Sequence, residues 1–353
     1  MMTYRQQTPR KPAGWGAVAL LLAGFTAIGC VTAISRDELV DEPIAFVYFD
    51  TETTRRRSEM IRDSMEREGG DSVGGRKPGV AEAKKVGRFL KDLIGHRGED
   101  PKFLGRLALL DPRTRDVSVV EGARKGAVPQ DWSADHKRLL FTQVVHNDRP
   151  QLFELDVATG QIGPMTHGRE AHPEGCYGPK GSVVYTSVDT SRGAPRARIM
   201  LYDPLERRPR QISGADYAYY PTCAPDGSQV VYSTVPATGG AQRIVIQSLE
   251  PGAEPRVLTS GKDPAFSADG SLIAFSAKLK GEWALWRIRP DGKGRVSLGY
   301  GGYSEHRPSL SPDNKLVLYV ADTTTNQRLF LRRLDGSGDR IFFDGGDGDR
   351  PIW

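Results

Sequence analysis

Residues 220–233 read YPTCAPDGSQVVYS, and the same phrase recurs further along the chain as DPAFSADGSLIAFS (263–276) and RPSLSPDNKLVLY (307–319). Each copy begins beside a proline, places a small or apolar residue before a polar turn, and continues into an alternating apolar run. Because the copies keep this order while their residues vary, they predict a tandem array of one small structural unit.

The spacing of the polar turns gives the period of the array. The third residue of each turn stands at position 135, 180, 226, 269 and 313, so the repeats are 43 to 46 residues long. The position three residues earlier is mostly apolar or aromatic and is occupied by Trp132, Tyr177, Cys223, Phe266, Leu310 and Trp353. Periods of this length are typical of propellers and solenoids.

Short strands fill each period. Within one repeat, 230–234, 243–249 and 256–259 alternate apolar and polar residues between Gly, Pro, Asp and Ser, which is a strand pattern. Four antiparallel strands per repeat make a propeller blade. Proline suits the start of an innermost strand because it cannot donate to the ladder. The prolines expected there are Pro173, Pro221, Pro264, Pro308 and Pro351.

The two ends of the array complement each other. Residues 44–50, 104–110 and 117–121 read as second, third and fourth strands with no first strand, whereas 350–353 read as a first strand alone. Joined, they make one blade, which removes exposed sheet edges. We therefore predict an all-β fold: a six-bladed β-propeller of four-stranded antiparallel blades over 35–353, closed by the C-terminal strand joining the N-terminal blade.

These repeats resemble the blades of TolB-like β-propellers, over roughly residues 129–353. TolB itself carries an α/β domain before its propeller, whereas only residues 31–42 precede the first strand here, so the resemblance implies a bare propeller. Binders and enzymes share this fold, so the resemblance does not by itself name a function.

The first 34 residues predict a signal peptide or membrane anchor. A basic start is followed by residues 13–34 without a charge. Ala27-Ile28-Gly29-Cys30 resembles a lipoprotein box, which implies lipidation at Cys30. An uncleaved membrane anchor and cleavage after Val31-Thr32-Ala33 are the alternatives. Each places the propeller on the outer side of the cytoplasmic membrane, because the basic flank stays inside.

Residues 51–102 interrupt the first blade and differ from the repeats in composition. Val86, Phe89, Leu90 and Leu93 recur at helical spacing with charges on the other face, which predicts an amphipathic helix in a partly flexible insertion. We expect the insertion near the mouth of the channel. It is interpreted as a lid or partner-docking helix, as a helix packed on the propeller, or as a disordered loop.

Four residues precede the inner-strand prolines and are expected to ring the channel: Tyr220, Asp263, Arg307 and Arg350. Arg suits carboxylates and Tyr supplies contact area, so this ring is interpreted as a site for a peptide terminus or acidic loop. The alternative is that its charges bridge neighbouring blades. His172 and His306 are expected near the same entrance.

Other chemistry has little support in the sequence. No Gly-x-Ser-x-Gly nucleophile motif is present, and the histidines do not share metal-ligand spacing. Asp344, Asp347 and Asp349 lack the spacing of a calcium loop and are expected in a solvated turn. Cys176 and Cys223 fall one register apart on adjacent inner strands, so free thiols are expected over a disulfide. A net charge of +5, spread along the chain, does not favour nucleic acid as a partner.

The sequence thus predicts a non-catalytic propeller, without metal or cofactor, that binds a protein or peptide in the cell envelope. It would be held at the outer side of the cytoplasmic membrane or on the outer membrane as a scaffold or accessory subunit. One alternative is a polysaccharide lyase or hydrolase with a metal at the channel mouth, because some TolB-like propellers are lyases with metal-binding histidines. Another is a structural subunit fixed through 51–102.

Overall fold

The computed structural model describes residues 33–56, 59, 104–145, 149–191, 196–206, 208–214, 217–236, 240–299, 302–323, 327–338, 340–343 and 347–353. They lie in one compact unit, Thr32–Trp353. The lipoprotein box ending at Cys30 and the predicted helix with Val86, Phe89, Leu90 and Leu93 lie outside the described residues. In the described part of the chain, no helix is long and apolar enough to cross a membrane.

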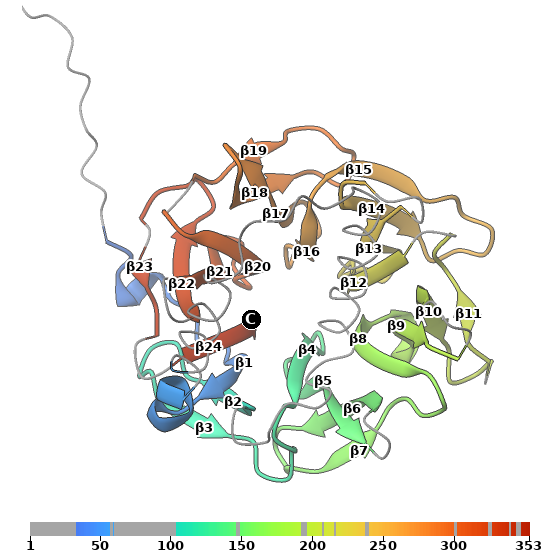
Figure 1. The fold of residues 1–353 in the computed structure, drawn as a ribbon, viewed down its shortest axis with the longest axis horizontal. Coiled ribbons are helices and arrows are strands. Elements are labelled where there is room, and N and C mark those ends of the chain that lie inside the picture. The colour runs from blue at the N-terminus through green and yellow to red at the C-terminus, as the bar shows by residue number, and fades with distance from the viewer. Residues whose placement is uncertain are drawn as a thin grey trace, which may run out of the picture. The chain divides into compact units, whose positions relative to one another are not determined.

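Six four-stranded antiparallel sheets form a ring around a central channel, as the sequence predicts (Figure 1). Blade 1 contains β24 (Asp347–Ile352), β1 (Ile44–Phe49), β2 (Arg106–Leu110) and β3 (Val117–Val119). Blade 2 contains β4 (Val128–Trp132), β5 (Arg138–Val145), β6 (Arg149–Asp156) and β7 (Ile162–Pro164). Blade 3 contains β8 (Ala171–Tyr177), β9 (Val183–Asp189), β10 (Arg196–Tyr202) and β11 (Arg210–Gln211).

The other three blades follow the same order from the channel outward. Blade 4 contains β12 (Tyr217–Cys223), β13 (Gln229–Val235), β14 (Arg243–Ser248) and β15 (Arg256–Ser260). Blade 5 contains β16 (Lys262–Phe266), β17 (Ile273–Leu279), β18 (Glu282–Ile288) and β19 (Val296–Ser297). Blade 6 contains β20 (Ser304–Leu310), β21 (Leu316–Asp322), β22 (Gln327–Arg333) and β23 (Arg340–Ile341). Short 3-10 helices occupy Arg36–Glu38 (η1) and Pro179–Gly181 (η3).

The blades form because each sheet buries both faces against its neighbours. In β21 the first six residues are all buried and are apolar or aromatic. In blades 2, 4, 5 and 6 an Asp side chain holds the hairpin turn after the inner strand. In blade 4 the Asp226 carboxylate accepts the backbone N–H of Ser228 at 2.9 Å. Gly227 follows Asp226 with a φ of +70°, which glycine adopts without strain. These turn residues are therefore required at the same place in the repeat, which is why their spacing shows the period of the array.

The ring closes by pairing of distant segments, as predicted. In blade 1, β24 is the inner strand and runs antiparallel to β1, with Val47 opposite Asp349 and Phe49 opposite Asp347. Trp353 is 8% exposed and belongs to the core shared by blades 1 and 6, together with Phe46 and Leu318. The closing residues are therefore part of the core and not a frayed tail.

A second contact joins the start of the described chain to the last blade. Ile34 and Leu39 are buried in the same core as Trp353. The Arg333 guanidinium of β22 binds the carboxylate of Glu38, with Nε and Oε2 2.7 Å apart. Hydrogen bonds from Arg333 and Ser35 lower the pKa of Glu38 to about 2. Residues 33–42 therefore fasten to blade 6 beside the closing strand.

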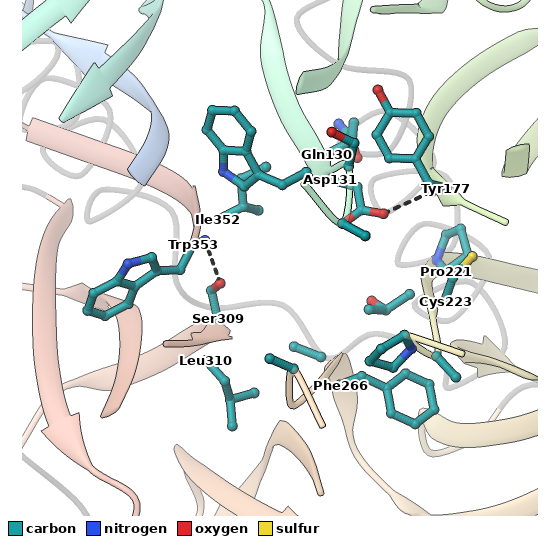
Figure 2. Close-up of a pocket in the computed structure, with 18 of the residues that line it drawn as sticks. Gln130, Asp131, Tyr177, Pro221, Cys223, Phe266, Ser309, Leu310, Ile352 and Trp353 are labelled. Carbon is teal, nitrogen blue, oxygen red and sulfur yellow. Dashed lines mark hydrogen bonds between the residues drawn. The ribbon is translucent and has the colours of Figure 1, made fainter. Parts of the chain in front are cut away.

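Neighbouring inner strands are bridged by polar side chains at one recurring position. The Asp131 carboxylate of blade 2 accepts the backbone N–H of Tyr177 in blade 3, at 2.8 Å. The Ser309 hydroxyl of blade 6 accepts the backbone N–H of Trp353, at 2.9 Å (Figure 2). In both cases the residue just before the apolar inner-strand position reaches that position in the next blade.

Cys176 and Cys223 form a disulfide, so the expectation of free thiols was wrong. Their Cα atoms are 5.7 Å apart, within the range that a disulfide spans. The offset of one register was read as pointing the two side chains to different faces. Cys176, however, precedes the apolar position of blade 3 and reaches that position in blade 4, as Asp131 and Ser309 do in their blades. The offset of one residue between Cys176 and Cys223 therefore allows the disulfide to form.

Removing Pro351–Trp353 is expected to destabilise the whole domain. The truncation exposes the core covered by Trp353, and loss of a buried aromatic side chain alone costs about 3–5 kcal/mol. Denaturant unfolding followed by circular dichroism measures the change. As a control, Leu205→Ala alters a residue that is 84% exposed and should leave the midpoint unchanged. A truncated protein that unfolds at the wild-type midpoint would contradict the closure.

Reducing the disulfide is expected to lower the free energy of unfolding by about 2–4 kcal/mol. The cysteines are 47 residues apart, and opening a loop of this length increases the entropy of the unfolded chain. The measurement is the denaturation midpoint with and without a phosphine reductant. The Cys176→Ser/Cys223→Ser protein should match reduced wild type and be insensitive to reductant. An equal response of both proteins to reductant would show that the bond has no stabilising role.

Candidate functional site: the central cavity

The central channel contains a cavity of about 810 Å³, a size that suits bound ligands. All six inner strands contribute to its wall, with residues that include Gln130, Tyr177, Cys223, Phe266, Leu310 and Ile352 (Figure 2). Its lining extends to the hairpin turns after the inner strands, among them residues 178–181 and 224–227. The cavity therefore opens at the hairpin-turn end of the channel.

This opening is at the opposite end from the insertion in blade 1. Phe49 ends β1 opposite Asp347, the first residue of the inner strand β24. The insertion 51–102 therefore leaves the blade at the strand-entry end of the channel. Of its residues, 51–56 and 59 are described, and these are helical. The chain thus enters the insertion at the strand-entry end, whereas the cavity opens at the other end.

A belt of charged and aromatic residues lies halfway along the inner strands. We define the belt as Glu174, Tyr220, Asp263, Arg307, Asp349 and Arg350. Four of these residues precede a proline and have a φ near +50°: Tyr220, Asp263, Arg307 and Arg350. The ladder register shifts beside each of them, in β12, β16, β20 and β24. Left-handed backbone is strained for residues other than glycine, so contacts in the surrounding structure must hold these four residues in this conformation.

The structure brings the four predicted ring residues into this belt, and all four line the cavity. Arg307 forms an ion pair with Asp349 of the neighbouring blade. Burial raises the pKa of Asp349, but attraction by Arg307 and Arg350 outweighs it and lowers the pKa to about 2. The alternative that belt charges bridge blades therefore holds for Arg307. Asp263 is paired with Lys262 at 3.2 Å.

Arg350 is placed differently from Arg307. Its guanidinium lies over the ring of Tyr220, 5.6 Å from the centroid, so it reaches from blade 1 to blade 4. This is a cation–π contact across the channel. Within the described residues the Arg350 guanidinium has no hydrogen-bonded acceptor, which leaves its donors available at the cavity.

Two carboxyl groups in the cavity wall, the buried Glu174 and the partly buried Asp131, were missed by the sequence analysis. Glu174 is 1% exposed; one oxygen accepts the backbone N–H of Tyr220 at 2.7 Å and the hydroxyl of Thr186 at 2.9 Å. Its other oxygen, Oε1, is buried without a hydrogen-bond partner. Burial raises the pKa of Glu174 to about 7, against the opposing attraction of Arg350. Burial also raises the pKa of Asp131 to about 7.

Alignment on prolines concealed Glu174. An alignment on prolines matches Pro173 with Pro221, which makes His172 the counterpart of Tyr220. Counting back from the apolar residues Tyr177 and Cys223 instead places Glu174 level with Tyr220. The spacing of the repeats therefore identifies Glu174 as a belt residue. In blade 3 the proline, Pro173, precedes the belt residue, whereas in blade 4 Pro221 follows it.

His172 and His306 are not part of the cavity lining. His172 is 5% exposed and contacts the Tyr185 ring at 4.6 Å between centroids, and burial lowers its pKa to about 4, with a further contribution from His167. His306 Nε2 lies 2.9 Å from the Asp322 carboxylate. Among the described residues, no group of three or more His, Cys, Asp or Glu side chains is arranged to hold a metal ion.

The solvated turn expected around Asp344, Asp347 and Asp349 was wrong for two of its residues. Asp347 and Asp349 belong to β24, and Asp347 is 4% exposed. Asp349 is partly buried beside Arg307. The alternation of Asp and Gly was read as a turn, but the segment pairs with β1. Asp344 lies outside the described residues.

The ring, its closure and its central cavity define a TolB-like six-bladed β-propeller. TolB from Acinetobacter baumannii superposes with a TM-score of 0.62 at 17% identity, over 89% of this chain and 67% of that one. A structure described as putative TolB from Agrobacterium tumefaciens gives a TM-score of 0.56 at 23% identity, over 68% of this chain and 88% of that one. At these identities the likeness concerns the fold alone.

Sequence comparison gives a relative without an assigned activity. The uncharacterized protein Atu1656 of Agrobacterium fabrum is 26% identical over 267 residues, which cover 70% of this chain and 87% of that protein. No family model matches this chain.

Glu174→Gln is expected to gain stability relative to wild type as the pH rises. Between pH 4.5 and about 7 the unfolded carboxyl is ionised while the folded one retains its proton, so Glu174 makes the wild type less stable with rising pH. A shift of this size corresponds to about 3 kcal/mol above pH 7. Denaturant unfolding at pH 4.5 and pH 8 measures it. Glu206→Gln, at an exposed site, is the control; a pH-independent difference for Glu174→Gln would contradict the assignment.

Proposed function

We propose that this protein is a non-catalytic propeller of the cell envelope that binds a segment of a protein or peptide partner in its central cavity. The observation that carries the proposal is the combination, in one cavity of about 810 Å³, of apolar wall residues with a belt carboxyl, Glu174, whose Oε1 has no hydrogen-bond partner. Pockets with an apolar wall and a few placed polar groups are typical of ligand sites.

The composition of the cavity favours a polypeptide ligand. Phe266, Leu310 and Trp353 offer apolar contacts, whereas Glu174 and Arg350 offer a hydrogen-bond acceptor and donors. A peptide needs both, because its side chains vary in polarity and its backbone carries donors and acceptors at every residue. The open hairpin-turn end gives such a segment a way in.

The disulfide supports a location outside the cytosol. Structural disulfides persist in oxidising compartments and are rare where thiols are kept reduced. Cys176 and Cys223 therefore agree with export through the basic and apolar stretch of residues 1–34. We propose that the propeller faces the outer side of the cytoplasmic membrane, held there by lipidation at Cys30 or by an uncleaved anchor.

The insertion gives the proposed complex a second point of contact. Because residues 51–102 leave blade 1 at the strand-entry end, a partner docked there would not compete with a ligand in the cavity. We propose that the insertion, through Val86, Phe89, Leu90 and Leu93, fixes the propeller within an envelope assembly, while the cavity receives the bound segment.

Site-specific photo-crosslinking tests the proposal. Benzoylphenylalanine in place of Phe266 on the cavity wall should crosslink to one or a few envelope proteins in intact cells. The same residue in place of Leu205, which is 84% exposed and does not line the cavity, should not yield these products. Mass spectrometry of the crosslinked peptides identifies the bound segment. Equal products from both positions, or products from position 205 alone, would argue against binding in the cavity.

A further inference from the structure

The cavity wall contains two carboxyl groups and one belt cation that form no ion pair with a described residue. Arg307 is neutralised by Asp349, and Asp263 by Lys262. The carboxyls of Glu174 and Asp131 also line the cavity, and neither forms an ion pair with a described residue. Arg350 is the belt cation without an acidic side chain in contact. A ligand that matches this arrangement carries a cation for these carboxyl groups and an acceptor for Arg350.

Glu174 is preorganised to receive a donor. Its Oε2 is fixed by the backbone N–H of Tyr220 and the hydroxyl of Thr186, so the carboxyl cannot rotate without losing two hydrogen bonds. Oε1 of the same group has no partner. A buried acceptor without a partner is costly, and a donor from a ligand removes that cost. The site is therefore incomplete without a hydrogen-bond donor.

The shape of the cavity favours a chain end over a passing loop. Its lining begins at the belt and extends to the hairpin turns. At the belt, the Arg350 guanidinium crosses to Tyr220 and Arg307 joins blades 6 and 1. These contacts narrow the channel where the cavity ends. A segment entering from the hairpin-turn end meets the belt with its tip.

We propose that the belt binds the free N-terminus of a peptide, with the α-ammonium group on Glu174 and a backbone carbonyl near the terminus accepting from Arg350. This inference rests on the proposed function, because it names the part of the partner that enters the cavity. Asp131, on the neighbouring inner strand, adds a second carboxyl to the cavity wall. Both a charged donor and an adjacent acceptor are present at the start of every unblocked polypeptide.

The electrostatic setting of Glu174 agrees with a cationic ligand. Burial raises its pKa to about 7; Arg350 on β24 lowers the pKa, whereas Asp263 on β16 raises it further. Tyr220 on β12 donates its backbone N–H, and Thr186 on β9 its hydroxyl. An ammonium group in contact favours the ionised carboxylate and offsets the cost of its burial.

A peptide library in two forms tests the inference. A hexapeptide library with randomised positions is passed over the immobilised full-length protein, once with free N-termini and once N-acetylated, and retained peptides are identified by mass spectrometry. We expect retention of free peptides and a loss of about tenfold or more in affinity on acetylation, measured by calorimetry on the best sequences. Amidation of the C-terminus should have no effect.

Variants locate the contact. Glu174→Gln keeps an oxygen acceptor for the Tyr220 N–H but removes the charge, and it should lower the affinity for free peptides about tenfold or more. Glu206→Gln should bind as wild type does. The acetylation comparison needs only wild-type protein, so the inference can be judged even if Glu174→Gln does not fold.

The remaining outcomes separate this inference from the proposed function. Equal retention of free and acetylated peptides, including those whose only ammonium is a lysine side chain, overturns the N-terminus assignment and leaves binding in the cavity intact. Loss of binding on C-terminal amidation overturns it in favour of a carboxylate on Arg350. Failure to retain peptides of either form, together with an absence of crosslinks from position 266, overturns both.

Discussion

The pairing of β24 with β1 is the constraint on which the rest of the molecule depends. It supplies the missing inner strand of blade 1 and brings Trp353 into the core between blades 6 and 1. It also sets Asp349 and Arg350 in the belt, so that Arg307 finds its partner and Arg350 reaches Tyr220. Without this one ladder there would be neither a closed ring nor a complete cavity floor.

The belt shows how a repeat can make a site that is not symmetric. In blades 1, 4, 5 and 6 the bulge and the proline place one residue at the same level, with a φ near +50°. The fold dictates that position but not the side chain, so the six blades present different chemistry to one space. Burial adds a further difference between these positions. It raises the pKa of Glu174 to about 7, although Arg350 acts in the opposite direction.

Much of the fold could be predicted from the sequence, because period, turn chemistry and alternation are local properties. The period predicted five blades, and the unmatched strands at the two ends predicted the sixth blade and the closure. The contacts between blades could not be predicted in the same way. The Cys176–Cys223 bond depends on how one inner strand is rotated against the next, which no single repeat contains. Glu174 was missed because blade 3 carries its proline one position early.

Ring closure also has a consequence for how the protein reaches its native state. Val47 and Asp349 are neighbours in a ladder although about 300 residues separate them. Forming such a contact costs the loop-closure entropy of the long intervening chain. Until β24 pairs with β1, the inner edge of β1 therefore has no hydrogen-bonding strand beside it. During that interval the edge is open to other chains. Efficient folding of this propeller therefore depends on preventing the unpaired edge of β1 from pairing with a strand of another chain.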